Sequence, residues 1–210
     1  MSRADVYFSA DVETDGPIPG PFSMLSFALV PAGRLLAPVG DGSARFEAPT
    51  REQLADAFYA ELRPISPNFE AEALAVNGLD REGLIEHGAD PGAVMADASE
   101  WIVERCEALG GGEPVLVGYP LGFDWSWLRW YFIRFGGESP FGHSRAFDIK
   151  TAAALDLGWP VSGSGRARLP AALQPERAHS HHAVDDAVAQ AQIFSKLMTR
   201  RYSNQDQDRA

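Results

Sequence analysis

Two carboxylates near the N-terminus are spaced to share one face of a strand. Residues 6–13 are apolar and β-branched and end at a Thr-Asp-Gly turn signal, which predicts a strand of about eight residues. Side chains alternate across a strand, so Asp11 and Glu13 are expected side by side. Because like charges at that spacing repel, one carboxylate holds a proton or a cation lies between them. Mg²⁺ fits such a pair, and two solvated acids at a strand end are the alternative.

A second acidic site is expected at the start of the last helix. Two aspartates compete for it within residues 181–187. At about 100° per residue, Asp185 shares a stripe with polar side chains. Asp186 lies instead between Ile193 and Leu197, on the apolar side. Asp186 is therefore expected to be buried, and since an unpaired buried carboxylate is costly, it needs a cation.

A third candidate is Asp124, which follows Phe123 at the expected start of a helix. A short apolar strand is predicted to end at Gly118, shortly before it. Sites gather at the carboxyl ends of strands in α/β folds, which favours a functional role. An aspartate here can equally be a helix N-cap that accepts from free backbone N–H groups. Both interpretations stay open at this point.

Three strands that could position the first pair are predicted in the N-terminal third. Runs bounded by Gly and Pro turns place them at residues 6–13, 22–30 and 58–62. A hairpin or irregular excursion is expected at 31–50 and a short helical turn at 50–56. Because the connections are short, we expect an antiparallel meander.

Helices and short strands alternate in the rest of the chain. Apolar residues at three- and four-residue steps predict helices at 91–109, 124–135 and 184–199, and short apolar runs predict strands at 115–118 and 147–149. This alternation indicates parallel additions to the first sheet. The expected fold is α/β, with a mixed sheet of antiparallel and parallel strands flanked by helices.

A single domain is expected. The chain of 210 residues is 45% hydrophobic, which is enough for one sizeable core and short for two. We assign the domain to residues 1–202, with a mobile loop at 163–168 and a disordered polar tail at 203–210.

The composition argues against a protein that coats long nucleic acid, because the net charge is −11 and such binders neutralise many phosphates. The acidic excess lies in residues 1–123, whereas residues 124–177 carry a small basic excess, so the C-terminal half is expected to meet any polyanion.

No apolar run is long enough for a membrane span, and the N-terminus has no signal-peptide core. With the single Cys106 unable to form an internal disulfide, a cytoplasmic location without membrane association is expected.

Together the acidic groups resemble the DEDDh branch of the DnaQ-like 3′–5′ exonucleases, which include ribonuclease T and the DNA polymerase III epsilon exonuclease domain. The resemblance covers residues 6–200 and rests on the Asp-x-Glu-Thr-x-Gly opening at 11–16, on Asp124 after a Gly-x-x-x-x-Phe stretch, and on His181-x₄-Asp186. The chain departs from the family at Asn77, where a histidine is usual, and at 118–124, which lack the usual His-Asn pair. Those departures bear on substrate preference more than on chemistry.

The resemblance implies a ribonuclease H-like fold and two divalent cations, Mg²⁺ or Mn²⁺. Two such ions about 3.5–4 Å apart can stabilise both the attacking and the leaving oxygen of a phosphodiester. On this basis Asp11 is the bridging ligand, Glu13 and Asp186 hold the cation that activates water, and Asp124 holds the cation on the leaving-group side. The four carboxylates would then be neutralised locally.

The resemblance also implies a histidine general base, for which an imidazole pKa near 6.5 is suited. His179, His181 and His182 compete for this role. We favour His181 because the inward-facing Asp186 lies five positions on. His182 is the rival, because it would share a face with Asp186 if the helix began earlier. The bland alternative for all three is a solvated loop or a fortuitous metal-binding tract.

Substrate contacts are expected from several further residues. Stacking or hydrogen bonding to a base suits Phe123 and Asn77, and phosphate contacts suit arginines in the loop before the histidines. The predicted substrate-binding set is Thr14, Gly16, Asn77, Phe123, Arg166 and Arg168. A turn at 14–16, core packing of Phe123 and a solvated loop for the arginines are the structural alternatives.

The expected function is a metal-dependent 3′–5′ exonuclease that removes nucleotides from single-stranded 3′ ends of RNA or DNA. Two other classes stay open: a non-catalytic nucleic-acid or protein-binding module of the same fold, and a small-nucleotide phosphodiesterase. A homodimer is compatible with the sequence.

Overall fold

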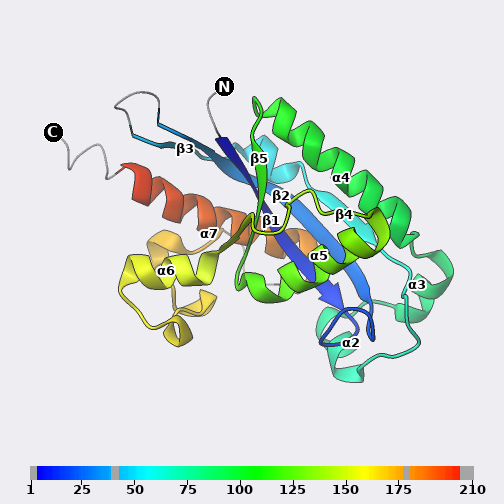
Figure 1. Cartoon of the computed structure of the whole chain (residues 1–210). Helices are drawn as coiled ribbons and strands as arrows, with labels where there is room; N and C mark the ends of the chain where they lie inside the picture. Colours follow the sequence, from blue (N-terminus) through cyan, green and yellow to red (C-terminus); the bar gives the residue numbers. More distant parts are fainter. Residues whose placement is uncertain (1–3, 39–42, 177–179, 204–210) are drawn as a thin grey trace.

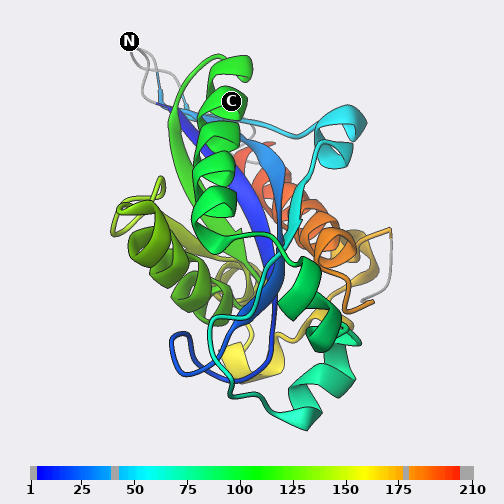
Figure 2. The same ribbon diagram turned by 90° about the vertical axis from the view of Figure 1, so that its right-hand side faces the viewer.

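A six-stranded sheet forms the centre of the protein in the computed structural model, which describes residues 4–38, 43–176 and 180–203 (Figure 1). Its strands are β1 (Ala4–Thr14), β2 (Met24–Leu36), β3 (Arg45–Glu47), β4 (Phe58–Glu61), β5 (Glu113–Gly118) and β6 (Ala146–Asp148). Helices cover both faces, as Figure 2 shows in the view turned by 90°. The predicted α/β fold with a helix-flanked sheet is confirmed.

The strand order follows from the lengths of the connections. β1 and β2 are joined by residues 15–23 and pair antiparallel, and β2 pairs antiparallel with both β3 and β4. β5 comes after a long helical connection and pairs parallel with β1, and β6 pairs parallel with β5. The order β3-β2-β1-β5-β6, with β4 also on β2, confirms the predicted mixture of antiparallel and parallel pairing.

Several helices begin at a side-chain N-cap or end at a glycine. They are α1 (Arg51–Ala55), α2 (Ala71–Asn77), α3 (Arg81–His87), α4 (Pro91–Ala108), α5 (Leu121–Gly136), α6 (Ile149–Leu157) and α7 (Ala183–Ser203). At the start of α4, for example, Asp90 accepts from the N–H groups of Gly92 and Ala93 at 2.9 and 3.1 Å. None of the described helices is long and apolar enough to cross a membrane.

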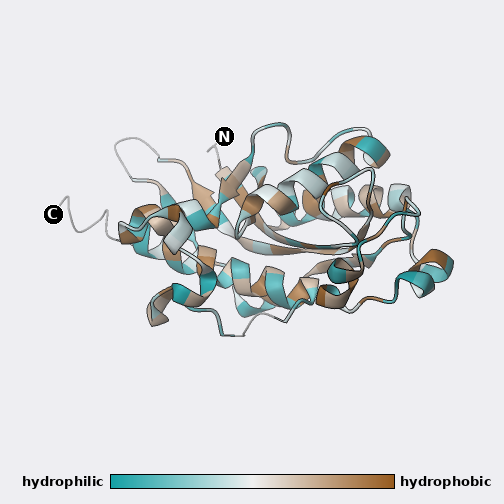
Figure 3. Ribbon diagram, turned by 90° about the horizontal axis from the view of Figure 1, so that it is seen from below, coloured by the Kyte–Doolittle hydropathy of each residue, from teal (hydrophilic) through white to brown (hydrophobic). Residues whose placement is uncertain are grey.

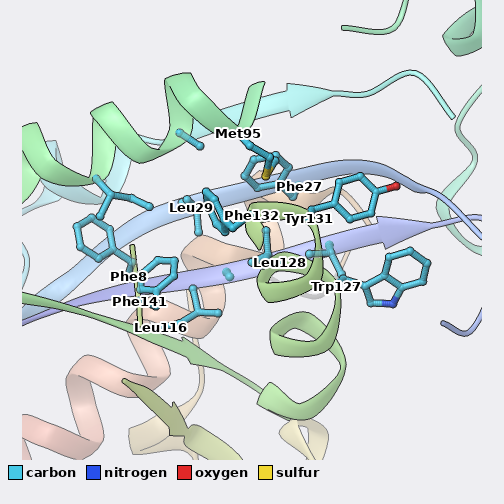
Figure 4. Close-up of a cluster of buried hydrophobic side chains, with 14 of the residues drawn as sticks. Phe8, Phe27, Leu29, Met95, Leu116, Trp127, Leu128, Tyr131, Phe132 and Phe141 are labelled. Carbon is cyan, nitrogen blue, oxygen red and sulfur yellow. The ribbon is translucent and has the colours of Figure 1, made fainter. Parts of the chain in front are cut away.

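Alternate side chains of β1 enter two separate cores. Phe8 and Val12 pack with α4 and α5 on one face, where Trp127 is also buried (Figure 4). Tyr7 packs on the other face against α7 and Phe194. Figure 3 shows the sheet edge-on between the two helical layers. Because β1 lies between them, its odd-numbered side chains face α7 all the way to its C-terminal end.

The structure corrects two predictions and does not describe the region of a third. α5 begins at Leu121, three residues before the predicted start, so Asp124 lies inside the helix and the N-cap interpretation is wrong. The predicted loop at 163–168 begins at the end of one 3₁₀ turn (Val161–Gly163) and contains a second (Arg166–Arg168). Ser164 is buried there, with its carbonyl accepting from the Tyr119 hydroxyl at 2.5 Å. The predicted tail at 203–210 lies outside the described residues, apart from Ser203 in α7.

Tyr131 offers a test of how α5 holds the sheet. Its fully buried hydroxyl accepts from the Met24 N–H at 2.7 Å, at the first residue of β2. We expect Tyr131→Phe to lower the free energy of unfolding by about 1–3 kcal/mol, because the buried Met24 N–H loses its acceptor. Urea unfolding followed by circular dichroism measures this. Tyr202→Phe is the control, and an equal loss in both variants would contradict the assignment.

Candidate active site

Three carboxylates converge between β1 and the first turn of α7. Asp11 and Glu13 project from the face of β1 that α7 covers, and Asp186 is fully buried in the helix opposite. One carboxylate oxygen of each lies within 4.8 Å of the other two. The alternation of the strand and the helical period together bring these residues into one cluster from opposite ends of the chain.

Asp124 approaches the same cluster from the other side of the sheet. β5 pairs with β1 only as far as Ser9, which leaves the neighbouring edge of β1 open beyond that point. The Val12 N–H on this stretch donates to Asp124 Oδ1 at 3.2 Å. The buried carboxylate is thereby fixed beside the backbone that joins Asp11 to Glu13, one turn into α5.

Electrostatics make the cluster costly without a cation. Burial, with the charges of Asp124, Glu13 and Asp186 added, raises the pKa of Asp11 well above its ordinary value, although Arg166 opposes this. Burial and then Asp186 raise the pKa of Glu13 to about 7. Burial raises the pKa of Asp124 to about 8, although the bond from Val12 opposes the shift. The deprotonated forms are therefore disfavoured by desolvation and mutual repulsion.

The donor set fits a hard divalent cation. All the converging ligand atoms are carboxylate oxygens, which Mg²⁺ and Mn²⁺ prefer over nitrogen or sulfur. A cation among Asp11, Glu13 and Asp186 would offset the repulsion that contributes to the raised pKa values of Asp11 and Glu13. Asp124 offers a further carboxylate at the edge of the same site.

Three polar contacts hold the carboxylates in place. Gln190 Nε2 donates to Asp11 Oδ1 at 2.8 Å, and Gln190 is almost fully buried. Arg166 Nη2 lies 3.3 Å from Asp186 Oδ1, and the His181 backbone N–H donates to Asp186 Oδ2 at 2.9 Å. The sequence reading missed Gln190, although its place one helical turn after Asp186 on a buried face was a detectable signal. Arg166, the predicted phosphate ligand, contacts the Asp186 carboxylate in this structure.

The histidines differ in their surroundings. His181 is exposed and adopts a left-handed backbone conformation, with φ of 56°. The ring of His182 stacks on Tyr59 of β4, with ring centroids 5.4 Å apart and planes 24° apart. His179 lies outside the described residues.

The other predicted substrate residues divide into buried and exposed groups. Thr14 is buried with its hydroxyl donating to the Gly16 carbonyl, and a Cβ on Gly16 would lie 2.2 Å from the Phe22 ring, so only glycine fits. Asn77 donates to the Thr14 carbonyl at 3.0 Å and accepts from the Leu79 N–H at 3.0 Å, so its amide braces the end of β1.

Phe123 and Arg168 lie at the surface. Phe123 is 43% exposed at the first turn of α5, with its ring 6.0 Å from that of Trp127. Arg168 is exposed and forms no ion pair with the described residues. The structure therefore leaves the Phe123 ring accessible next to Asp124, and it does not bring Arg168 into the carboxylate cluster.

A curated relative extends over nearly the whole chain. The 3′–5′ DNA exonuclease Cap18 of Escherichia coli is 34% identical over 195 residues, which is 90% of this chain and 90% of that protein. No family model matches the chain.

Solved structures of 3′-exonucleases share the fold. The nuclease domain of 3′hExo, a DEDDh family member bound to rAMP, aligns with a TM-score of 0.60 and 12% identity over 96% of this chain and 94% of that one. A 3′-exonuclease that recognises a histone mRNA stem-loop aligns with a TM-score of 0.66 and 12% identity over 96% of this chain and 65% of that one. E. coli Exonuclease I in complex with dT13 aligns with a TM-score of 0.56 and 14% identity, and the chain spans 99% of its own length but 43% of that enzyme. These likenesses confirm the ribonuclease H-like fold.

The raised carboxylate pKa values predict how the metal-free protein responds to pH. Glu13 and Asp124 titrate near 7 and 8 when folded and near 4 when unfolded, so the folded state binds more protons between these values. In chelator, Tm should therefore fall as pH rises from 5 to 8. In Glu13→Gln, thermal melts should show a smaller decrease of Tm over the same pH range than in the wild-type protein. The matched control, Glu100→Gln at an exposed position, should have the same slope of Tm against pH as the wild-type protein. Equal slopes in all three proteins would contradict the assignment.

Proposed function

The chain belongs to the DEDDh-type 3′–5′ exonucleases, and from that premise we propose that it hydrolyses single-stranded DNA from the 3′ end with two divalent cations and a histidine general base. The observation that carries this proposal is the convergence of Asp11, Glu13 and Asp186 within 4.8 Å, with Asp124 at the edge of the cluster. We assign the activity to one domain over residues 1–202. DNA is favoured over RNA because the 34% identical relative is a DNA exonuclease.

Four carboxylates would hold the two cations. The charges of Asp124, Glu13 and Asp186 all act on Asp11, which suits a shared ligand. Glu13 and Asp186 would complete one cation site and Asp124 the other. When bound, such ions stabilise the attacking and leaving oxygens of a phosphodiester. Gln190 would orient Asp11 through its hydrogen bond, as outer partners of metal ligands commonly do.

His181 is our choice of general base. A neutral imidazole nitrogen of His181 would accept the proton of the attacking water at neutral pH. The backbone bond from His181 to Asp186 ties its segment to the carboxylate cluster. His182 is the weaker choice, because its ring is already stacked against Tyr59.

The phosphate and the terminal nucleotide would meet residues around this centre. Arg166 is 3.3 Å from Asp186, so its guanidinium lies next to the position a scissile phosphate would take. The exposed ring of Phe123 offers a stacking surface for a base next to Asp124. Thr14, Gly16 and Asn77 would act indirectly, by shaping the end of β1 that carries Glu13.

A labelled oligonucleotide tests the activity and its polarity. With Mg²⁺ or Mn²⁺, single-stranded DNA labelled at its 5′ end should shorten stepwise from the 3′ end, and chelator should stop the reaction. Asp124→Asn should lower kcat about a thousandfold, because several kcal/mol of transition-state stabilisation is lost. The proposal fails if the products are internal fragments or if chelator has no effect. Faster degradation of matched RNA would overturn the DNA preference.

A pair of histidine variants tests the general base. His181→Ala should lower kcat by about 10²–10⁴ with little change in KM, because proton transfer is lost and substrate contacts remain. His182→Ala should lower kcat less than tenfold, since only a stacking contact is removed. Steady-state kinetics on one oligonucleotide compare them. Near-wild-type activity of His181→Ala, with a large loss in His182→Ala, would transfer the role to His182.

A further inference from the structure

The outer face of α5 forms a surface that the carboxylate cluster does not use. A shallow groove of about 420 Å³ runs along the helix. A second groove, of about 490 Å³, shares Trp130 and Arg134 with it and continues onto the segment after β4. We call the joined surface the α5 groove and define it by Arg63, Trp125, Arg129, Trp130, Ile133 and Arg134.

The α5 groove carries positive charge that is not neutralised. Among the described residues no ion pair is formed by Arg63, Arg129 or Arg134, whereas Arg81, Arg145 and Arg166 are each paired with a carboxylate. Asp124, the one acidic residue in the sequence of α5, is buried toward the catalytic cluster. Asp90 borders the second groove and carries a negative charge, with its Oδ1 accepting from two backbone N–H groups, so the three arginines remain in excess. Arg129 donates to the Gly142 carbonyl at 2.5 Å, and the Arg134 guanidinium lies 5.2 Å from the centroid of the Phe135 ring, contacts that leave both positive charges in place. In a chain of net charge −11, these arginines form a local site for a polyanion.

Aromatic rings lie between the arginines. Trp130 is only partly exposed and packs against Tyr131 and Phe135, with ring centroids 5.3 and 5.9 Å away, so its orientation is fixed. Trp125 is also partly exposed, and the Arg129 guanidinium lies 5.6 Å from the centroid of its ring. Ile133, which is 44% exposed, extends the apolar surface. Alternating cations and anchored aromatic rings is the pattern that binds single-stranded nucleic acid by phosphate contacts and base stacking.

The groove lies on the same helix as one carboxylate of the catalytic cluster. α5 carries Asp124 and the exposed Phe123 in its first turn, and Figure 1 shows the helix packed in front of the C-terminal half of β1. At 1.5 Å per residue, Phe123 lies about 16 Å from Arg134 along the helix, a length that a few nucleotides span. A Cβ on Gly20, in the turn after β1, would lie 3.4 Å from the Trp130 ring, so the groove also borders the turn that follows Glu13.

We propose that the α5 groove binds the single-stranded DNA upstream of the 3′-terminal nucleotide, with phosphates on Arg63 and Arg134 and a base on Trp130. The inference rests on the proposed function, since it assumes that a DNA 3′ end occupies the carboxylate cluster. The groove would then set affinity for longer strands and leave the hydrolytic step unchanged.

The double variant Arg63→Gln/Arg134→Gln tests the groove with two substrates. One is a single-stranded dT oligomer of about twenty nucleotides, and the other is the p-nitrophenyl ester of thymidine 5′-monophosphate, which has no upstream nucleotides. We expect kcat/KM for the oligomer to fall about tenfold and that for the ester to stay within about twofold. The matched control is Arg51→Gln/Arg201→Gln, which removes two exposed arginines elsewhere and should leave kcat/KM unchanged for both substrates.

Salt dependence and a ring variant give independent readings. Losing two phosphate contacts should reduce the slope of log KM against log salt for the oligomer by about 1.4. Trp130→Leu, which keeps apolar bulk beside Phe135, should also lower kcat/KM for the oligomer and not for the ester. Thermal melting verifies that this variant is folded. Equal losses of kcat/KM for the ester and the oligomer would overturn the proposal. An unchanged KM and salt slope for the oligomer would also overturn it, and would favour a protein partner for this face.

A binding assay separates this proposal from the proposed function. If wild-type protein hydrolysed neither substrate, the exonuclease assignment would fail. Fluorescence anisotropy of the labelled oligomer would still test the groove, because it needs no turnover. An unchanged Kd in Arg63→Gln/Arg134→Gln would then overturn the groove, whereas an increase of about tenfold would support it.

Discussion

Repulsion among buried carboxylates at the C-terminal end of β1 is the constraint around which the site is built. The pKa values of Asp11, Glu13 and Asp124 are all raised, with burial as the largest cause in each. The chain offsets part of the cost with donors from three elements, namely the Val12 N–H, Gln190 and Arg166. These donors hold the carboxylates in position but offset only part of the repulsion, so the carboxylates still favour a bound cation.

The position of β1 makes this crowding mechanically possible. A strand buried on both faces is held by two cores, so its C-terminal end cannot bend away from the charges it carries. β5 stops pairing at Ser9, and the opening that results is where α5 inserts Asp124. A longer β5 would satisfy the Val12 N–H with a strand partner and leave no place for the fourth carboxylate.

Periodicity explains what the sequence could predict. The alternation of a strand places Asp11 beside Glu13, and the helical stripe separates buried Asp186 from Asp185, because both patterns are local. The start of α5 was misjudged because Leu121, Gly122 and Phe123 extend the helix without a polar N-cap, and Pro120 precedes it without a side-chain bond. The contact between Arg166 and Asp186 depends on the 3₁₀ turns after α6, which carry no periodic signal.

Cation binding and substrate binding should be linked in this protein. A phosphodiester that approaches the metal-free cluster meets carboxylates of its own sign, so a bound cation would raise the affinity for the proposed nucleic-acid substrate. By thermodynamic reciprocity, the proposed nucleic-acid substrate would then raise the affinity for the cation by the same factor. Arginines of the α5 groove act on phosphates outside the cluster, where the carboxylates' field is screened by solvent. In this proposal two surfaces of α5 have separate roles. Asp124, in its buried first turn, helps to bind the cation, and Arg134, in its exposed last turn, attracts the phosphates of the nucleic acid.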